Sequence, residues 1–330
     1  MAIVLHRADC LDVLFGSKEE GELGSRLGVP YMRAQAASLA VTLHVRRVSD
    51  EGGEEELSLS FSQSSLGLCA ISGVVWDAGL LLVDFLAQQE MALCMSGCGC
   101  GGGDYAESEC GGDLLVPRSL GTVLELGTHW HGASTMSRHH DVVLPITGSG
   151  TGVVGVCCSL LGSCRSVLLT DAVLSDLLLE NVDNNRGRIH SSCPPGCDLE
   201  PAARRRAEVT TLQFAWGSHV STLFDHHWDS VICSDVLYDD KCHDQLLRTL
   251  LQLRYGRLYL SYKCRNADRE RAFLSALEQH AGRARVAEGA SVRMVNLRRS
   301  QMHHLHVIIF EGSCEVTGEE SHSVDQEELL

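Results

Sequence analysis

Short apolar runs alternate with longer amphipathic stretches through the second half of the chain. The runs that we assign to strands are Thr122–Leu126, Val167–Thr170, Val209–Leu212, Ser230–Ser234, Arg257–Tyr262 and His304–Phe310. The stretches between them that we assign to helices are Gly152–Leu161, Asp176–Asn185, His243–Leu253 and Arg269–His280. Strands and helices in alternation predict an α/β, Rossmann-like fold, in which a mostly parallel sheet is covered by helices on both faces.

The N-terminal part has a different pattern. Val41–Val48 and Glu56–Phe61 alternate apolar and polar residues on either side of an acidic, glycine-containing turn, which predicts a β-hairpin. Ala78–Leu93 is almost continuously apolar and predicts a mostly buried helix.

These patterns divide the chain into three parts. Residues 1–66 form an N-terminal extension with the hairpin, and residues 67–311 form the α/β domain. We expect insertions in that domain at 94–113, 128–147 and 186–207, which are rich in glycine, histidine or proline and arginine. The acidic segment 312–330 is predicted to be disordered.

Charge and cysteine content narrow the class of partner and compartment. The formal net charge of −16 disfavours binding to a phosphate backbone and suits a basic protein surface better. The 15 cysteines, with no secretory signal at Met1 and no apolar run that could cross a bilayer, are more typical of reduced thiols. We therefore expect a cytoplasmic protein, with the nucleus also open, and no nucleic-acid or membrane partner.

Two groups of metal-ligating residue types lie in the expected insertions. They are the cysteines Cys94, Cys98, Cys100 and Cys110 and the histidines His129, His131, His139 and His140. The cysteines lack a paired C-x₂-C knuckle and stand among many glycines, which is unlike a structural zinc site. We expect no metal site in this protein.

A glycine-rich stretch follows the first strand of the α/β domain. Val123–Leu126 runs into Gly127, and Gly148–Gly152 (GSGTG) precedes a helix of small residues. Glycines let a ligand approach the backbone, and a strand ending in Asp171 can offer a carboxylate to ribose hydroxyls. The pattern indicates a nucleotide-type cofactor. It leaves NAD and S-adenosylmethionine both open, because the same loop also satisfies G-x-G-x-x-G.

Later motifs distinguish the two cofactors. They are VVWDAG at 74–79, Phe214-Ala-Trp216-Gly, the LLTD and LLLENVDNN stretches, CSDVLYDD at 233–240 and the closing HLHVIIF. In this order they resemble the seven-stranded (class I) protein-lysine methyltransferases of the group that modifies chaperones and ATPases. The resemblance spans roughly residues 67–310. It implies a seven-stranded sheet, S-adenosylmethionine as cofactor and a lysine on a protein substrate, such as an AAA ATPase or a chaperone, as acceptor.

The resemblance also assigns residues to the site. Those that it implies for cofactor binding are Trp76, Glu125, Gly127, Gly148, Ser149, Gly150, Gly152, Asp171, Trp216 and Ser234. Asp235 and Tyr238 are implied to line the channel for the acceptor lysine. The transfer requires a neutral amine aligned with the methyl group. We therefore expect Asp235 and Tyr238 to position groups and not to act as strong bases.

The main departure from the family pattern is the segment between Gly127 and Gly148. Deleting residues 128–148 would restore an uninterrupted VLELG-SGTG motif. Either the segment bulges outward and Val123–Leu126 remains the central strand, or Val142–Thr147 takes that place. We favour the first arrangement, because Val123–Leu126 carries the acidic residue and lacks a proline.

Two other functions stay open. One is a catalytically impaired binding protein with the methyltransferase fold, because the insertion falls in the tightest turn of the site. The other is an NAD-dependent oxidoreductase, although we find no Tyr-x-x-x-Lys pair that could serve its chemistry.

Overall fold

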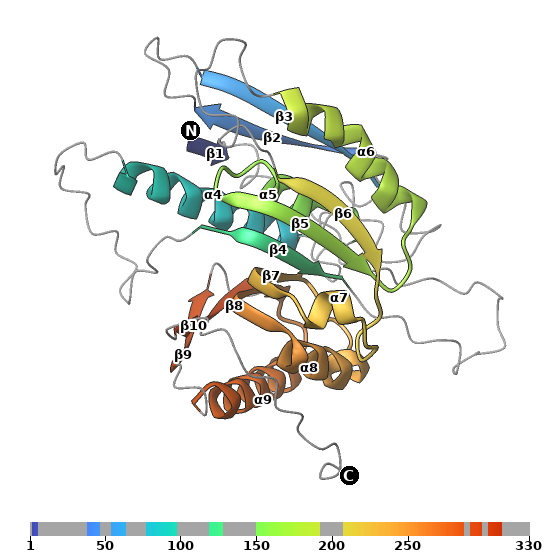
Figure 1. The fold of residues 1–330 in the computed structure, drawn as a ribbon, viewed down its shortest axis with the longest axis vertical. Coiled ribbons are helices and arrows are strands. Elements are labelled where there is room, and N and C mark those ends of the chain that lie inside the picture. The colour runs from blue at the N-terminus through green and yellow to red at the C-terminus, as the bar shows by residue number, and fades with distance from the viewer. Residues whose placement is uncertain are drawn as a thin grey trace, which may run out of the picture.

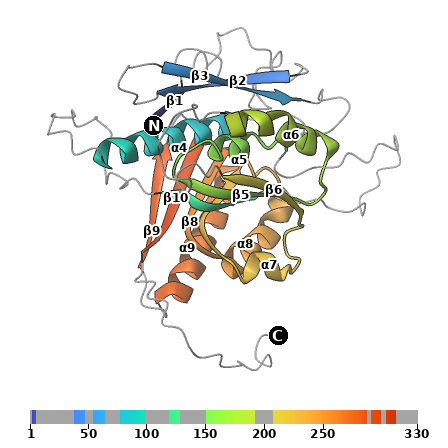
Figure 2. The same ribbon diagram turned by 45° about the horizontal axis from the view of Figure 1, so that its top comes forward.

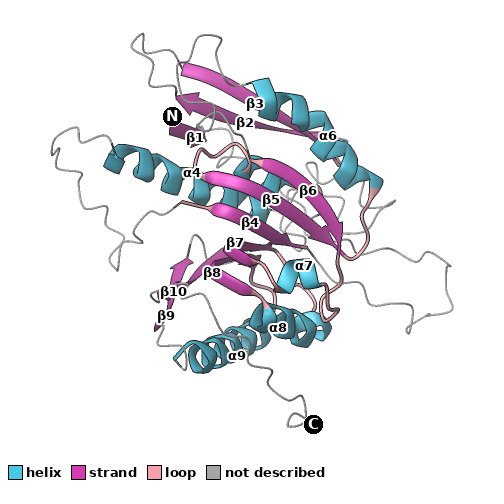
Figure 3. Cartoon of the chain, viewed as in Figure 1, coloured by secondary structure: helices cyan, strands magenta, loops and turns pink. Residues whose placement is uncertain are grey.

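A seven-stranded sheet forms the centre of the α/β domain. The computed structural model describes residues 2–5, 38–46, 54–63, 77–97, 119–127, 150–191, 207–286, 291–298 and 303–311. The strands are β4 (Gly121–Leu126), β5 (Cys164–Asp171), β6 (Glu208–Gln213), β7 (His227–Ser234), β8 (Arg254–Lys263), β9 (Ser291–Arg298) and β10 (His303–Glu311). Their order in the sheet is β6-β5-β4-β7-β8-β10-β9. The first five are parallel, and β10 runs antiparallel to both β8 and β9 (Figures 1 and 3).

Helices cover both faces of this sheet, as the alternation predicted. One face carries α4 (Asp77–Gly97), α5 (Val153–Cys158) and α6 (Asp176–Ser191), and the other carries α7 (Ser221–Phe224), α8 (His243–Gln252) and α9 (Ala267–Val286). Alternate strand residues serve the two layers: Val123 packs in the first core and Leu124 in the second. Figure 2 shows the two helix layers on opposite faces of the sheet. The Rossmann-like fold class is confirmed.

The N-terminal hairpin is also confirmed, and it belongs to a separate three-stranded sheet. β2 (Ser38–Arg46) pairs antiparallel with β3 (Glu54–Ser62), and β1 (Ala2–Leu5) pairs with β2. β1 was not predicted, because four residues are too few to show a period. Leu59 and Phe61 of β3 are fully buried in the core that α4, α5 and α6 share. The hairpin is therefore packed onto the face of the domain that α4, α5 and α6 cover.

Two segments predicted as insertions begin inside helices. α4 continues to Gly97 and α6 to Ser191, so residues 94–97 and 186–191 are helical, and the predicted helices, which ended at Leu93 and Asn185, were too short. β9 and the short α7 were not predicted either. Residues 98–113, 128–147 and 192–206 of the three insertions and the tail 312–330 lie outside the described residues, as do the cysteines at 98–110 and the histidines at 129–140. None of the helices that the structure describes is long and apolar enough to cross a membrane.

Candidate cofactor and acceptor site

The carboxylate of Glu125 lies against the start of α5, the helix that follows the glycine loop (Gly148–Gly152). β4 stands between β5 and β7, and Glu125, near its end, is 3% exposed. Its Oε2 accepts a hydrogen bond of 2.7 Å from the backbone N–H of Gly155 in α5. Val123–Leu126 is therefore the central strand, as favoured from the sequence. The contact with Gly155 shows that Glu125 has kept its place next to the helix that follows the insertion.

The glycines of the loop are required by geometry. Gly150 and Gly152 have φ angles of 59° and 74°, in the left-handed region that favours glycine. A Cβ on Gly152 would lie 2.7 Å from Leu178 Cδ1 of α6. At Gly155 a Cβ would overlap Leu169 and come within 2.6 Å of Glu125 Oε2. The backbone can pass this closely over the carboxylate only without side chains.

Asp171 ends the neighbouring strand, β5, and is fully buried. Its Oδ1 accepts a hydrogen bond of 3.1 Å from Val173 N, and its backbone O accepts one of 2.7 Å from Phe214 N. Gly127 N, at the end of β4, donates to Thr170 O at 3.1 Å. The ends of β4, β5 and β6 are thus joined at one edge, with the carboxylate of Asp171 held in a defined orientation.

The two carboxyl groups of this region, those of Glu125 and Asp171, are poorly solvated. Burial raises the pKa of Glu125 from 4.5 to about 8; the Gly155 N–H opposes this shift and the negative charge of Asp171 adds to it. A ligand that brings a positive charge would favour the ionised form of these carboxyl groups, and a carboxylate oxygen can accept more than one hydrogen bond from hydroxyl donors. S-Adenosylmethionine has a sulfonium and a ribose. The residues present therefore fit that cofactor.

Asp235 follows the last residue of β7 and joins it to β8. Its φ angle is 54°, the only positive value among the described residues that are not glycine. Its N–H donates to Ser261 O at 2.7 Å. Arg265 donates to both carboxylate oxygens, from Nη1 to Oδ1 at 2.8 Å and from Nη2 to Oδ2 at 2.7 Å, and Lys263 N also donates to Oδ1 at 3.1 Å. The carboxylate thus fixes the backbone at the strand end.

Ser234 and Tyr238 flank Asp235, and both are partly exposed. The Oγ of Ser234 lies 3.0 Å from where a Cβ on Gly79 would stand, so the start of α4 packs over the end of β7. Tyr238 is close to Arg265: burial lowers the pKa of that guanidinium, but Asp235 first, then Glu270 and Tyr238, raise it overall. Tyr238 is thus the accessible polar group beside the fixed Asp235–Arg265 pair.

One residue that was predicted to bind the cofactor lies in the apolar core. Trp216 is 3% exposed and packs in the apolar core with Phe214, Phe224 and residues of α8. Its loop follows β6, and Phe214 N connects that loop to Asp171. Trp76, Gly148 and Ser149 lie outside the described residues. The remaining predicted residues gather at the carboxyl edge of β4, β5 and β7, together with the glycine loop.

Sequence reasoning missed two residues that support this edge. Arg265 lies 30 positions from Asp235, and nothing in its local pattern distinguishes it from an exposed arginine. Asn181 contacts both β3 and the glycine loop. Its only signal was its place in the LLLENVDNN stretch, which carried the family resemblance but named no role.

Comparison with known proteins agrees with this geometry. The family model described as lysine methyltransferase matches residues 54–280, which is more than half of the chain. EEF1A lysine methyltransferase 3 of Mus musculus is 28% identical over 193 residues, covering 53% of this chain and 75% of the relative. Protein N-lysine methyltransferase METTL21A of Mus musculus is 30% identical over 134 residues, covering 40% of this chain and 54% of the relative.

More distant similarities are partial. UPF0665 family protein C23C4.06c of Schizosaccharomyces pombe is 26% identical over 153 residues, which are 46% of this chain and 41% of that protein. The chain thus spans between 41% and 75% of these three relatives. The solved structure of a human methyltransferase 10 domain containing protein matches 70% of this chain and 81% of that chain at 9% identity, with a TM-score of 0.36. On the extent of the family match, together with the glycine loop and the strand-end carboxylates, the chain belongs to the lysine methyltransferase family.

Proposed function

We propose that this chain transfers a methyl group from S-adenosylmethionine to the Nζ atom of a lysine on another protein. The observation that carries the proposal is the 2.7 Å bond from Gly155 N to Glu125 Oε2, which ties the start of α5, directly after the glycine loop, to the end of β4. Asp171, at the end of the adjacent strand, supplies the second carboxylate. Membership of the lysine methyltransferase family supports the choice of reaction.

The residues of the chain would share the work as follows. Bound S-adenosylmethionine supplies an activated methyl group on sulfur. Glu125 would hold the start of α5 in place, and Asp171 would accept hydrogen bonds from ribose hydroxyls. Asp235 and Arg265 hold the end of β7, and Tyr238 orients the incoming amine.

Catalysis in this scheme is largely alignment. A lysine amine has an ordinary pKa near 10.4 and attacks only after losing its proton to water. Transfer from water into a partly buried channel lowers that pKa and favours the neutral form. Holding the amine in line with the methyl group supplies the remaining rate enhancement. No residue has to act as a strong base.

The substrate class is inferred less directly. One relative is named for methylating EEF1A, and the resemblance in the sequence points to ATPases and chaperones. The net charge of −16 favours a basic acceptor surface over nucleic acid. We propose a protein substrate of the ATPase or chaperone class that presents its lysine in a basic patch, in the cytoplasm or nucleus.

The test begins with a calorimetric titration of the full chain with S-adenosylmethionine, and with NAD as the control. We expect micromolar binding of the first and none of the second. A variant lacking residues 128–148 is titrated in parallel and is expected to bind more tightly, because its loop is uninterrupted. Absence of binding in both proteins would contradict the proposal. Transfer of labelled methyl to lysine in a cell extract, with a Tyr238→Phe variant as comparison, then tests the reaction.

A further inference from the structure

Two asparagines of α6 attach the N-terminal sheet to the α/β domain. Asn181 and Asn185 lie one helical turn apart and are 0% and 1% exposed. Asn181 accepts from Ser62 N at 2.7 Å and donates to Ser62 O at 3.1 Å. Asn185 accepts from Ser60 N at 3.2 Å and donates to Ser60 O at 2.9 Å. The two side-chain amides therefore hydrogen-bond to the backbone groups of β3 that point away from β2. α6 runs beside β3 at this place (Figure 1).

Only one of the two amides reaches the glycine loop. Asn181 uses its second N–H to donate to Thr151 O at 3.0 Å. Asn185 uses its second N–H within its own helix, on Asn181 O at 2.8 Å. Two otherwise equivalent residues thus differ in a single respect, which is the contact with the loop.

The contact is made at the part of the loop whose backbone is freest to rotate. Thr151 stands between Gly150 and Gly152, and both glycines have positive φ angles. Glycine has the widest choice of backbone conformations, so the peptide between two glycines is the easiest part of the loop to rotate. Thr151 is 2% exposed, and its carbonyl would lose a hydrogen bond in another orientation. Asn181 therefore selects one orientation of this peptide.

We propose that Asn181 is a positioning residue for cofactor binding, which holds the Gly150–Gly152 loop in its binding shape and ties that shape to β3. The N-terminal sheet is then part of the binding machinery and not only an appended element. The inference rests on the proposed function for the identity of the cofactor. It predicts an effect on cofactor affinity that loss of stability alone would not produce.

The matched variants are Asn181→Asp and Asn185→Asp. Each keeps an acceptor for the β3 N–H and loses the two donors. Both are expected to lower the melting temperature to a similar extent. Asn181→Asp is expected to weaken S-adenosylmethionine binding by about tenfold or more in calorimetry, as the loss of one buried hydrogen bond implies. Asn185→Asp is expected to stay within about twofold of the unmodified chain, as a site that does not touch the ligand loop should.

The outcomes separate the inference from the proposed function. If neither the unmodified chain nor the variant lacking residues 128–148 binds S-adenosylmethionine, the proposed function fails. If the unmodified chain binds, and Asn181→Asp and Asn185→Asp have equal affinities while folded, the positioning role of Asn181 is overturned. Tight binding by the unmodified chain and Asn185→Asp, with weak binding by Asn181→Asp, supports it.

A second pair of variants covers the case in which Asn181→Asp does not fold. Ser62→Pro removes the N–H that donates to Asn181 Oδ1, and Ser60→Pro removes the N–H that donates to Asn185 Oδ1. Both N–H groups point away from β2, so neither variant removes a hydrogen bond between β2 and β3. Ser62→Pro is expected to weaken cofactor binding more than Ser60→Pro, although both lie in β3. By linkage, the cofactor should slow hydrogen exchange of the Ser62 amide more than that of Ser60. Equal affinities of the two proline variants, with equal exchange, would overturn the inference.

Discussion

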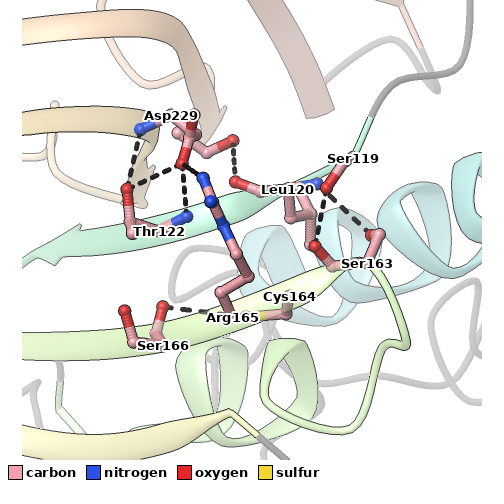
Figure 4. A network of polar contacts seen from close by, with 9 residues as sticks. Ser119, Leu120, Thr122, Ser163, Cys164, Arg165, Ser166 and Asp229 are labelled. Atoms are coloured by element: carbon pink, nitrogen blue, oxygen red, sulfur yellow. Dashed lines mark hydrogen bonds and ion pairs between the residues drawn. The ribbon is translucent and has the colours of Figure 1, made fainter. Parts of the chain in front are cut away.

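The two ends of β7 carry the same pair of residues in different surroundings. Near its start, Asp229 accepts a 2.6 Å bond from Arg165, and just after its end Asp235 is bonded to Arg265. Asp229 also accepts from Thr122 N at 2.7 Å and from Thr122 Oγ1 at 2.8 Å. Figure 4 shows this network at the amino edge of the sheet. Each aspartate therefore ties β7 to a neighbouring strand.

The pairs differ in exposure and in backbone conformation. Arg165 and Asp229 have side chains that are 69% and 37% exposed, whereas Arg265 and Asp235 are 25% and 7% exposed. Asp235 also has a positive φ angle, which an L-residue with a Cβ adopts at some cost. Unfavourable backbone geometry persists only where the surroundings enforce it. The comparison indicates that the amino edge uses its pair for stability and the carboxyl edge uses its pair to fix the shape of a site.

The largest expected difference comes from removing each aspartate. Asp235→Ala leaves a mostly buried guanidinium without its carboxylate, and we expect a loss of about 3 kcal/mol in the free energy of unfolding. Asp229→Ala leaves an exposed arginine and is expected to cost about 1 kcal/mol. Urea denaturation measures both. Equal losses would break the comparison. Asparagine tolerates a positive φ angle, so Asp235→Asn separates the cost of the backbone conformation from the cost of losing the charge.

The buried acid of the carboxyl edge should give the stability a pH dependence. The pKa of Glu125 is raised from 4.5 to about 8, so folding favours its protonated form. Its stabilising contribution is complete below pH 4.5 and is lost as the pH rises to about 8, by up to about 1.4 kcal/mol for each unit of pH. Glu125→Gln keeps an acceptor for Gly155 and removes the titration. Melting temperatures of the two proteins between pH 5 and 9 should diverge as the pH rises. Parallel curves would show that Glu125 is already ionised in the fold.

Two glycines with positive φ angles allow a matched test of the edges. Gly152 (φ 74°) lies at the carboxyl edge against Leu178, and Gly121 (φ 59°) lies at the amino edge against the carboxylate of Asp229. Alanine at either position is expected to destabilise the fold by roughly 2 kcal/mol, from the left-handed backbone and the steric contact together. Only Gly152→Ala should also weaken S-adenosylmethionine binding, measured by calorimetry. An equal loss of affinity in Gly121→Ala would remove the distinction between the edges.

The smallest expected effect is at the exposed arginine. Arg165→Gln should cost less than about 1 kcal/mol and lose most of that effect at high salt, because surface ion pairs are weak and screened. Burial raises the pKa of Asp229, but the Thr122 bonds and Arg165 outweigh it and lower the pKa below 3.8. The contribution is therefore present above pH 3.8 and lost as the pH falls through the lowered value. Urea midpoints at neutral pH and near pH 3 measure it; a larger effect at acid pH would contradict the assignment.

The sequence predicted much of the sheet and the edge that carries the site. The strands of the parallel part and the buried helix α4 have strong periodicity, and their motifs fall where strands end. The boundaries were less well predicted: α4 and α6 run on past their apolar faces, and β1 was too short to show a pattern. The motif around Glu125 was recognised despite its interruption, because its acid and its glycines kept their identity on both sides.

The partners of these residues could not be predicted. Arg265 is 30 positions from Asp235, and Ser62 is 119 positions from Asn181. Neither pair has a local spacing that distinguishes it from chance. The surroundings of Trp216 could not be predicted either. A tryptophan after a strand has the same sequence context whether it faces a ligand or the core, and Trp216 is buried in the core.

The sequence alone determined the kinds of element, their order and the family, because periodicity reports which face of a segment is buried and motifs report which chemistry a strand end carries. The tertiary structure alone decided that Glu125 is buried under Gly155, that Asp235 is fixed by Arg265 and that Asn181 joins β3 to the glycine loop. These contacts depend on how the layers pack. Packing brings distant backbone groups within hydrogen-bonding distance and removes water from them, and no local pattern of residues encodes that removal.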